Sequence, residues 1–311
     1  MAILKGIVSR LTGSAGNLTF RRQGGATILS EKNTNVTNTR TAAQQKHRMK
    51  WANVIQMYKG ISPLLNQAFE NKPARVSDYN MFTKLNLQRE PVYLTKAEVT
   101  AGACVVAPYQ ITLGSLPSIE VEGTGADGVT DISLGDLTIS GTTTVAEFSN
   151  AVVTNNLGWN YGDQLSFFSI LQRINSATMM PYGVFTATEV VLSRSNNALL
   201  WDCVNPAGFA SKGGFLAHGT DEGDGAYCWV HSRKNKSKTL TSTQVLVCSN
   251  AIFEDYTSPD AYDRAVNTYG GESDVFLAPK SVDTLSAGSG SEGTVTPPDQ
   301  GDDGADEEPT V

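Results

Sequence analysis

Histidines and cysteines are the residues of this chain best suited to chemistry, and they are few. The sequence holds three histidines, His47, His218 and His231, and four cysteines. Nucleophilic catalysis needs a nucleophile, a base within hydrogen-bonding reach and usually a third group that orients the base. No GxSxG, HExxH or GxxxxGK[ST] motif accompanies these residues. The sequence therefore predicts a protein that is not an enzyme and that needs no cofactor.

Two segments carry residue types that ligate metals. Cys228 and His231 have the Cys-x-x-His spacing of some zinc sites. Their segment is typical of a strand, in which residues three apart point to opposite faces, so we expect Cys228 on the inner face and Trp229 and His231 on the outer face. The loop 220–225 clusters oxygen ligands but lacks the full spacing of a calcium loop. We predict a buried structural cysteine, a solvated turn and no metal site.

The charge of the chain is unevenly distributed. Residues 1–60 carry ten Lys and Arg against one acid, a net charge of +9, while eight acids and no base follow Lys280. The total of -7 therefore leaves -8 for residues 61–280. A basic head, an acidic body and an acidic tail make the average charge uninformative, and the head is the feature that points to a partner.

The basic head contains two candidate nucleic-acid-binding groups. Lys46, Arg48 and Lys50 fall on a predicted helix, and Arg21 and Arg22 on a predicted hairpin tip. These side chains could contact nucleic-acid phosphates, which would make the chain a nucleic-acid-binding or packaged cargo protein. They could equally contact an acidic neighbouring protein, including a second copy of this chain, or form a solvated surface.

The segment Ser14–Lys32 predicts a β-hairpin, with glycines in its turn. A lone hairpin is only marginally stable in water, so we expect it to dock on a partner as an arm that adds to a neighbour's sheet edge. The predicted partner contacts are made by four of its residues: Phe20, Arg21, Arg22 and Ile28.

Helices are predicted directly after the arm. Thr41 and Gln44 have capping-box spacing, and Trp51, Ile55 and Tyr58 give an apolar stripe on a helix that Gly60 can end. Ser62-Pro63 predicts a helix restart, and a third helix fits 77–86. Thr144-Val-Ala-Glu147 is a second capping box, which predicts a helix to about Asn155.

From Pro91 onward the alternation of apolar and polar residues predicts antiparallel strands. The expected strands cover 92–99, 109–113, 118–122, 136–140, 163–171, 188–193, 226–231 and 243–248. The fold class is mainly β (α+β), with an antiparallel, immunoglobulin-like β-sandwich region and one inserted helix. The predicted organisation is a hairpin arm and linker (1–40), a helical segment (41–90), a β domain (91–183), a second β region of the same or another domain (184–285) and a disordered acidic tail (286–311).

The residues also resemble a known family. GIVSRLTGSAGNLTFRRQGGATILSEK, RTAAQQKHRMKWA, SDYNMFTKLNL, GDQLSFFSILQ and WVHSRKNKSKTLTSTQVLV are similar, in this order, to blocks of a family of uncharacterised proteins from Bacteroidota and their phages, crAss-like phages included. The resemblance covers most of residues 1–250 and leaves the acidic tail outside it. No catalytic residue comes with the family. The resemblance implies a structural component of a tailed-phage virion, and we expect a head-tail or tail ring protein or a capsid-associated protein that assembles through its N-terminal arm.

Further expectations concern location and partners. The start MAILKGIVSRLTG has too short an apolar run for a signal peptide, and no run reaches the length of a membrane span. We therefore expect a protein made in the bacterial host cytoplasm, located in the virion, and bound to copies of itself and to other virion proteins. The four cysteines are expected to be reduced core residues. Trp159, Tyr161 and Trp229 leave a glycan-binding β module as an alternative, although packing within the β structure is the favoured interpretation of these aromatics.

Overall fold

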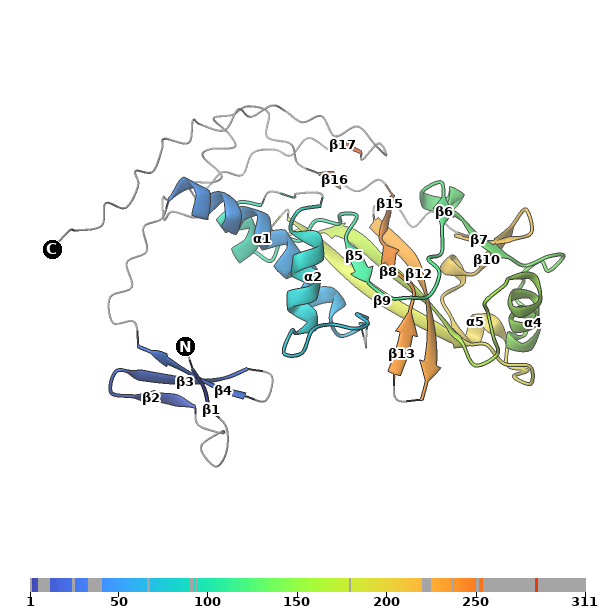
Figure 1. Cartoon of the computed structure of the whole chain (residues 1–311). Coiled ribbons are helices and arrows are strands. Elements are labelled where there is room, and N and C mark those ends of the chain that lie inside the picture. Colours follow the sequence, from blue (N-terminus) through green and yellow to red (C-terminus); the bar gives the residue numbers. More distant parts are fainter. Residues whose placement is uncertain are drawn as a thin grey trace.

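The computed structural model shows a mainly β protein, which confirms the mainly β class predicted from the sequence (Figure 1). The structure describes residues 2–4, 12–23, 26–32, 41–65, 68–89, 92, 94–178, 180–219, 225–236, 238–249, 252–253 and 283–284. The acidic tail, for which disorder is predicted, lies outside these residues, as does nearly all of the loop 220–225.

The N-terminal residues form a small antiparallel sheet. Its strands are β1 (Ala2–Leu4), β2 (Gly13–Ala15), β3 (Leu18–Gln23) and β4 (Ala26–Glu31), in the order β1-β4-β3-β2. The predicted hairpin is confirmed as β3 and β4, which pair from Leu18–Glu31 to Gln23–Ala26. The expectation of a lone hairpin is wrong, because β1 and β2 add a strand to each side of it.

The body is organised around one antiparallel sheet. Its strands are β8 (Gln164–Ile174), β9 (Pro181–Val191), β12 (Gly225–Asn235) and β13 (Lys238–Thr241), in the order β13-β12-β8-β9, with β15 (Val247–Ser249) also beside β12. The sheet therefore draws its strands from both predicted β regions, 91–183 and 184–285.

The two long central strands of this sheet are buried on both faces. In β8, Phe168 and Ile170 belong to one hydrophobic cluster, while Leu165 and Phe167 on the other face belong to a second. In β12, Cys228 packs in the first cluster and Trp229 in the second. Such strands need apolar residues at consecutive positions, and the run Ser-Phe-Phe-Ser-Ile-Leu of β8 has them.

Helices cover the first face of the sheet. They are α1 (Ala42–Ile61), α2 (Asp78–Asn86) and α3 (Lys96–Thr100). A short strand pair, β5 (Gln110–Thr112) with β14 (Gln244–Val245), accompanies them. Asn53 of α1 docks through its side-chain amide, which donates to the carbonyl of Val105 at 2.8 Å and accepts from the same residue's N–H at 2.8 Å. Asn86 of α2 makes the equivalent pair of bonds to Gln110. Each side-chain amide thus makes the two hydrogen bonds that a residue of a neighbouring strand would make with the same backbone.

A second sheet and a helix cover the other face. The sheet contains β6 (Val121–Glu122), β7 (Val129–Ser133), β10 (Ala210–Lys212) and β11 (Phe215–Ala217), in the order β10-β11-β7-β6. Beside it lie α4 (Val145–Asn155), α5 (Leu200–Cys203) and the single turns η1 (Gly125–Asp127) and η2 (Pro206–Gly208). Two further short strands, β16 (Ile252–Phe253) and β17 (Asp283–Thr284), pair with each other in a separate sheet. The predicted α4 capping box at Thr144 is confirmed.

Three predicted elements are wrong. The strand expected at 92–99 contains α3 instead, because Thr95 and Glu98 form a capping box with bonds of 3.3 and 2.7 Å. Residues 136–140 join no described strand, and the expected restart at Ser62 is only a turn. On α1, the Trp51 stripe is half-buried, and the fully buried face carries Met49, Asn53 and Met57 instead.

Candidate functional site

The four predicted partner-contact residues lie on the N-terminal sheet, but not on one face of it. Directly opposed residues of antiparallel strands share a face. Arg21 is opposite Ile28, and Phe20 is opposite Leu29, so Arg21 and Ile28 share one face while Phe20 and Arg22 share the other. Arg21 and Arg22 are exposed, Phe20 is half-buried and Ile28 is buried. The arginines are therefore the accessible members of the group.

The helical nucleic-acid candidates also divide between two faces. Successive residues of a helix are rotated by about 100°, so Lys46 and Lys50 lie in one row and Arg48 lies on the far side of α1. Arg48 is exposed, and both lysines are half-buried. A single duplex could not contact all three side chains at once from one side of the helix.

The Cys228–His231 pair is separated by the sheet, as predicted from strand alternation. Cys228 is buried in the first cluster, which confirms a structural cysteine, and burial raises the pKa of its thiol. The expected outer face is wrong, because Trp229 is 0% and His231 2% exposed. That face packs against the second sheet rather than water. Among the described residues, no three His, Cys, Asp or Glu side chains are grouped to hold a metal.

The structure instead places His231 in a buried polar cluster that sequence reasoning missed. Its Nε2 lies 2.9 Å from Oδ2 of Asp163, which also accepts from the guanidinium of Arg233 at 2.6 Å and from the N–H of Asn160 at 2.9 Å. A second bond of 2.6 Å joins Arg233 Nε to Oδ1 of Asp163. The ring of Trp159 stacks on His231 at 3.8 Å.

The electrostatics of this cluster follow from its burial and pairing. Burial acts to raise the pKa of Asp163, but the bonds from Arg233, Asn160 and His231 outweigh it and hold that pKa below its usual range. Burial lowers the pKa of His231 although Asp163 acts in the opposite direction. The carboxylate is thus ionised and the imidazole neutral, with the proton on Nε2, because an ionised carboxylate only accepts. The hydroxyl of Ser242 contacts the backbone N–H of His231 and not its ring. The cluster ties β8 to β12 and to the preceding turn, which is a structural role.

The aromatic residues proposed for glycan binding do not form a platform. Trp229 is buried, Trp159 is stacked on His231, and Tyr161 lies under Arg194, 4.5 Å from ring centre to guanidinium carbon. The Tyr161 hydroxyl donates to Asn150. Packing was the favoured interpretation of these rings, and their burial and contacts bear it out.

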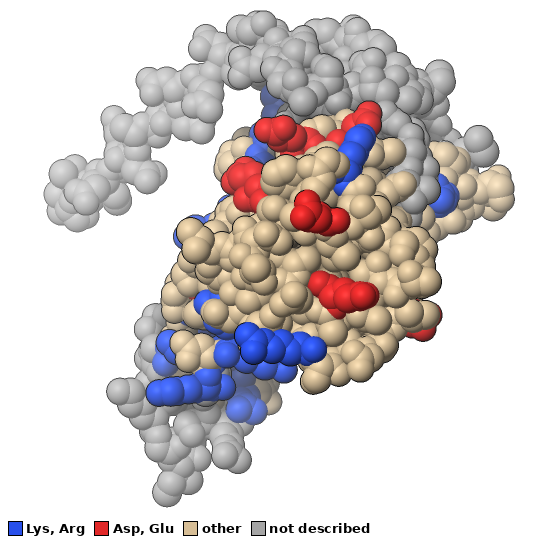
Figure 2. All heavy atoms as spheres, turned by 90° about the vertical axis from the view of Figure 1, so that its right-hand side faces the viewer, with Lys and Arg blue, Asp and Glu red and all other residues tan. Residues whose placement is uncertain are grey.

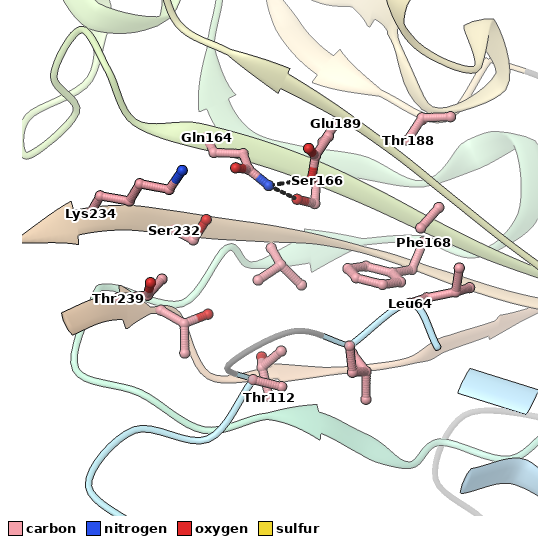
Figure 3. Close-up of a pocket in the computed structure, with 15 residues that line it drawn as sticks. Leu64, Thr112, Gln164, Ser166, Phe168, Thr188, Glu189, Ser232, Lys234 and Thr239 are labelled. Atoms are coloured by element: carbon pink, nitrogen blue, oxygen red, sulfur yellow. Dashed lines mark hydrogen bonds between the residues drawn. The ribbon is translucent and has the colours of Figure 1, made fainter. Parts of the chain in front are cut away.

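A groove of about 520 Å³ lies on the first face of the central sheet. Its floor is apolar, with Phe168 and Val230, and the segment after α1 contributes Leu64. Its rim is polar, and Figure 3 shows Gln164, Ser166 and Glu189 together on one side. The amide of Gln164 donates to Glu189 at 2.5 Å and to Ser166 at 3.1 Å. The groove can hold an extended side chain, and its lining carries both a carboxylate, Glu189, and an ammonium group, Lys234.

Basic side chains also gather away from the predicted head. Lys234, Lys236 and Lys238 are exposed around the β12–β13 turn. Figure 2 shows Lys and Arg at the lower end of the molecule, at the height of this turn in Figure 1, and Asp and Glu higher up. The run Arg-Lys-Asn-Lys-Ser-Lys is visible in the sequence, and its charge density could have indicated an exposed tip.

Comparison of the chain with protein-family models, curated proteins and solved structures finds no match. Within the part of the chain that the structure describes, no helix is long and apolar enough to cross a membrane.

Proposed function

We propose that the chain is a structural subunit of a tailed-phage particle and that it assembles through its N-terminal sheet. The observation that carries the proposal is the make-up of this sheet. It is formed by residues 2–31 alone, its four strands pair with one another, and it exposes Arg21, Arg22 and 43% of Leu18. A sheet of four short strands can be stable where it covers an apolar face, and docking on a neighbouring subunit would add to that stability.

The hydrophobic clusters of the body support an arm that is separable from the core. Among the described residues, neither cluster contains a residue before Val54. This supports a body whose two hydrophobic clusters pack without the N-terminal sheet. The likeness to proteins of Bacteroidota phages supports the particle as its setting, with the virion as its location.

The test is the molar mass in solution, by size-exclusion chromatography with light scattering, of the full-length chain and of a variant lacking residues 1–32. We expect a defined oligomer that the deletion converts to folded monomers. Thermal unfolding of the deleted chain checks that its body is intact. Equal oligomers for both chains would refute assembly through the N-terminal sheet.

A second candidate function is binding of nucleic acid, which the gathering of Lys and Arg at one end favours (Figure 2). Because binding releases counterions, the logarithm of the affinity should then fall by about 0.9 per phosphate contact for each tenfold rise in salt concentration. The matched experiment compares the full chain with Lys234→Glu/Lys236→Glu/Lys238→Glu and with Lys46→Glu/Lys50→Glu. Absence of retention on DNA or RNA at low salt would exclude this function.

A further inference from the structure

The polar half of the groove is laid out by the register of the central sheet. Directly opposed residues of antiparallel strands share a face. Ser232 of β12 is opposite Gln164 of β8, so these two side chains are neighbours at the middle of the groove. Lys234 lies two residues further along β12, and Glu189 of β9 is opposite Ser166, two residues in the other direction. The sheet therefore places an ammonium group and a carboxylate on either side of Gln164, as Figure 3 shows.

Neither charged group is neutralised by a partner in the fold. Glu189 accepts from the amide of Gln164, but in the described part of the chain no ion pair involves Glu189 or Lys234. Two strand spacings across the sheet and four residues along it separate these residues, so their Cα atoms lie about 16 Å apart. The register thus leaves space for a ligand between the ammonium group and the carboxylate.

Hydroxyl groups beside Lys234 are also available. Thr239 of β13 is opposite Lys234 and lines the groove. Among the described residues, neither Thr239 nor Ser232 has a side-chain hydrogen bond. The hydroxyls of Thr112 and Thr188, which also line the groove, are instead bonded to backbone groups. Hydroxyl donors next to an ammonium group are the contacts that a ligand carboxylate requires.

The inner end of the groove is apolar. Phe168 and Val230 form its floor, and Leu64 covers it from the segment after α1. This end adjoins the carboxylate, because Phe168 is opposite Ala187, two residues before Glu189 on β9. The volume of about 520 Å³ lies within the range of small-molecule sites, about 300–1,000 Å³.

The charges of the groove restrict the class of ligand. A cation without a negative group would meet Lys234, and an anion without a positive group would meet Glu189. A neutral ligand that displaced water would leave both charges unpaired. Stacking of a sugar ring is disfavoured, because Phe168, the aromatic residue of the described lining, is only 6% exposed. A zwitterion with an apolar group matches all three parts of the groove.

We propose that this groove binds a free α-amino acid with an apolar side chain. The ligand carboxylate lies against Lys234, Ser232 and Thr239. The ligand ammonium group lies against Glu189, and the apolar side chain lies on Phe168. This site goes beyond the proposed function, since it requires no assembly of subunits.

The first test is isothermal titration calorimetry of the full-length chain with L-leucine and L-phenylalanine at neutral pH. Three further probes each lack one group of leucine: N-acetyl-leucine lacks the ammonium group, leucine amide lacks the carboxylate and glycine lacks the apolar side chain. We expect the first two to bind about tenfold or more weakly than leucine, because each loses a charge-assisted hydrogen bond, and glycine also to bind more weakly.

Two results of this titration would overturn the proposal. One is the absence of binding by both amino acids at millimolar concentrations. The other is binding of N-acetyl-leucine or leucine amide with the affinity of leucine, because the groove would then not recognise a zwitterion.

The second test changes the protein. Glu189→Gln removes the charge but keeps an acceptor for Gln164, and Lys234→Met removes the ammonium group but keeps an unbranched stem. Lys238→Met is the matched control, because Lys238 is adjacent to Thr239 on β13 and points to the opposite face. We expect the affinity for leucine to fall about tenfold or more in the first two variants and to stay unchanged in the control.

The three substituted side chains are exposed, so the variants should fold, and thermal unfolding checks this. Leucine binding that neither Glu189→Gln nor Lys234→Met weakens would refute the assignment of the site to this groove.

Discussion

Replacement of Asp163 by asparagine should destabilise the body strongly, although the side chain keeps its shape. The carboxylate is 2% exposed and accepts from Arg233, His231 and the N–H of Asn160. Asparagine removes the negative charge and turns an N–H₂ group toward these donors. Breaking a buried ion pair from one side costs about 3–5 kcal/mol. Because Arg233 is 27% exposed and water can solvate it, we expect about 2–4 kcal/mol.

The assay is urea unfolding followed by tryptophan fluorescence, with Asp136→Asn as an exposed control that should change stability by less than about 0.5 kcal/mol.

The pH dependence of stability gives a second test. Since the folded state lowers the pKa of Asp163, its contribution is present above about pH 4 and is lost as pH falls further. The folded state also lowers the pKa of His231, so stability should decline as pH drops below about 6.5. Asp163→Asn should remove the first decline and keep the second. A loss of unfolding free energy below about 1 kcal/mol at pH 7, or an unchanged acid transition, would refute an ionised Asp163 that pairs with Arg233 and His231.

Three further outcomes follow from single contacts. Asn53→Ala leaves the buried N–H and C=O of Val105 without their side-chain partner and should cost about 2–4 kcal/mol in urea unfolding, whereas Asn155→Ala, which loses an exposed local bond, should cost under about 1 kcal/mol. Gly114→Ala would place a Cβ 2.0 Å from the carbonyl oxygen of Thr241, so its free energy of unfolding should fall by about 1–3 kcal/mol and its melting temperature should fall with it. Gly141→Ala, whose Cβ would have its nearest atom at 3.3 Å, should unfold at a temperature close to that of the wild type. Cys203 is exposed, contrary to the expectation that all cysteines are core residues, and burial raises the pKa of Cys104 to about 12; iodoacetamide at pH 8 should therefore modify Cys203 and spare Cys104 in mass spectra of the native protein.

Helix starts were the most predictable features of the fold. Thr41 and Thr144 were identified from the spacing of a hydroxyl and a Glu or Gln, and both side chains accept from the backbone N–H three residues on. Thr95-Lys-Ala-Glu98 has the same spacing, but the residues around it also alternate in polarity, which favours the strand predicted at 92–99. A capping box involves two specific bonds, whereas alternation over eight residues also fits a short helix with one buried side.

The buried polar cluster could not be predicted because it depends on which surface covers the second face of the sheet. Strand alternation correctly separated Cys228 from His231, but it cannot distinguish a face in water from a face under another layer. Asp163 and His231 are 68 residues apart and meet only through the pairing of β8 with β12. The one available signal was the apolar character of consecutive residues in β12, Tyr-Cys-Trp-Val, which is typical of a strand covered on both sides.

Coverage of both faces also decides where this protein can interact. The helices occupy one side of the central sheet and the second sheet the other, so the large apolar surfaces are used within the fold. What remains accessible is the β9 edge with its groove, the basic β12–β13 turn and the N-terminal sheet. Of these, β9 has, among the described strands, a partner on one side only. A strand edge can pair with any strand, so the choice of partner would rest on side chains such as Glu189 and Lys234, which line the groove beside this edge.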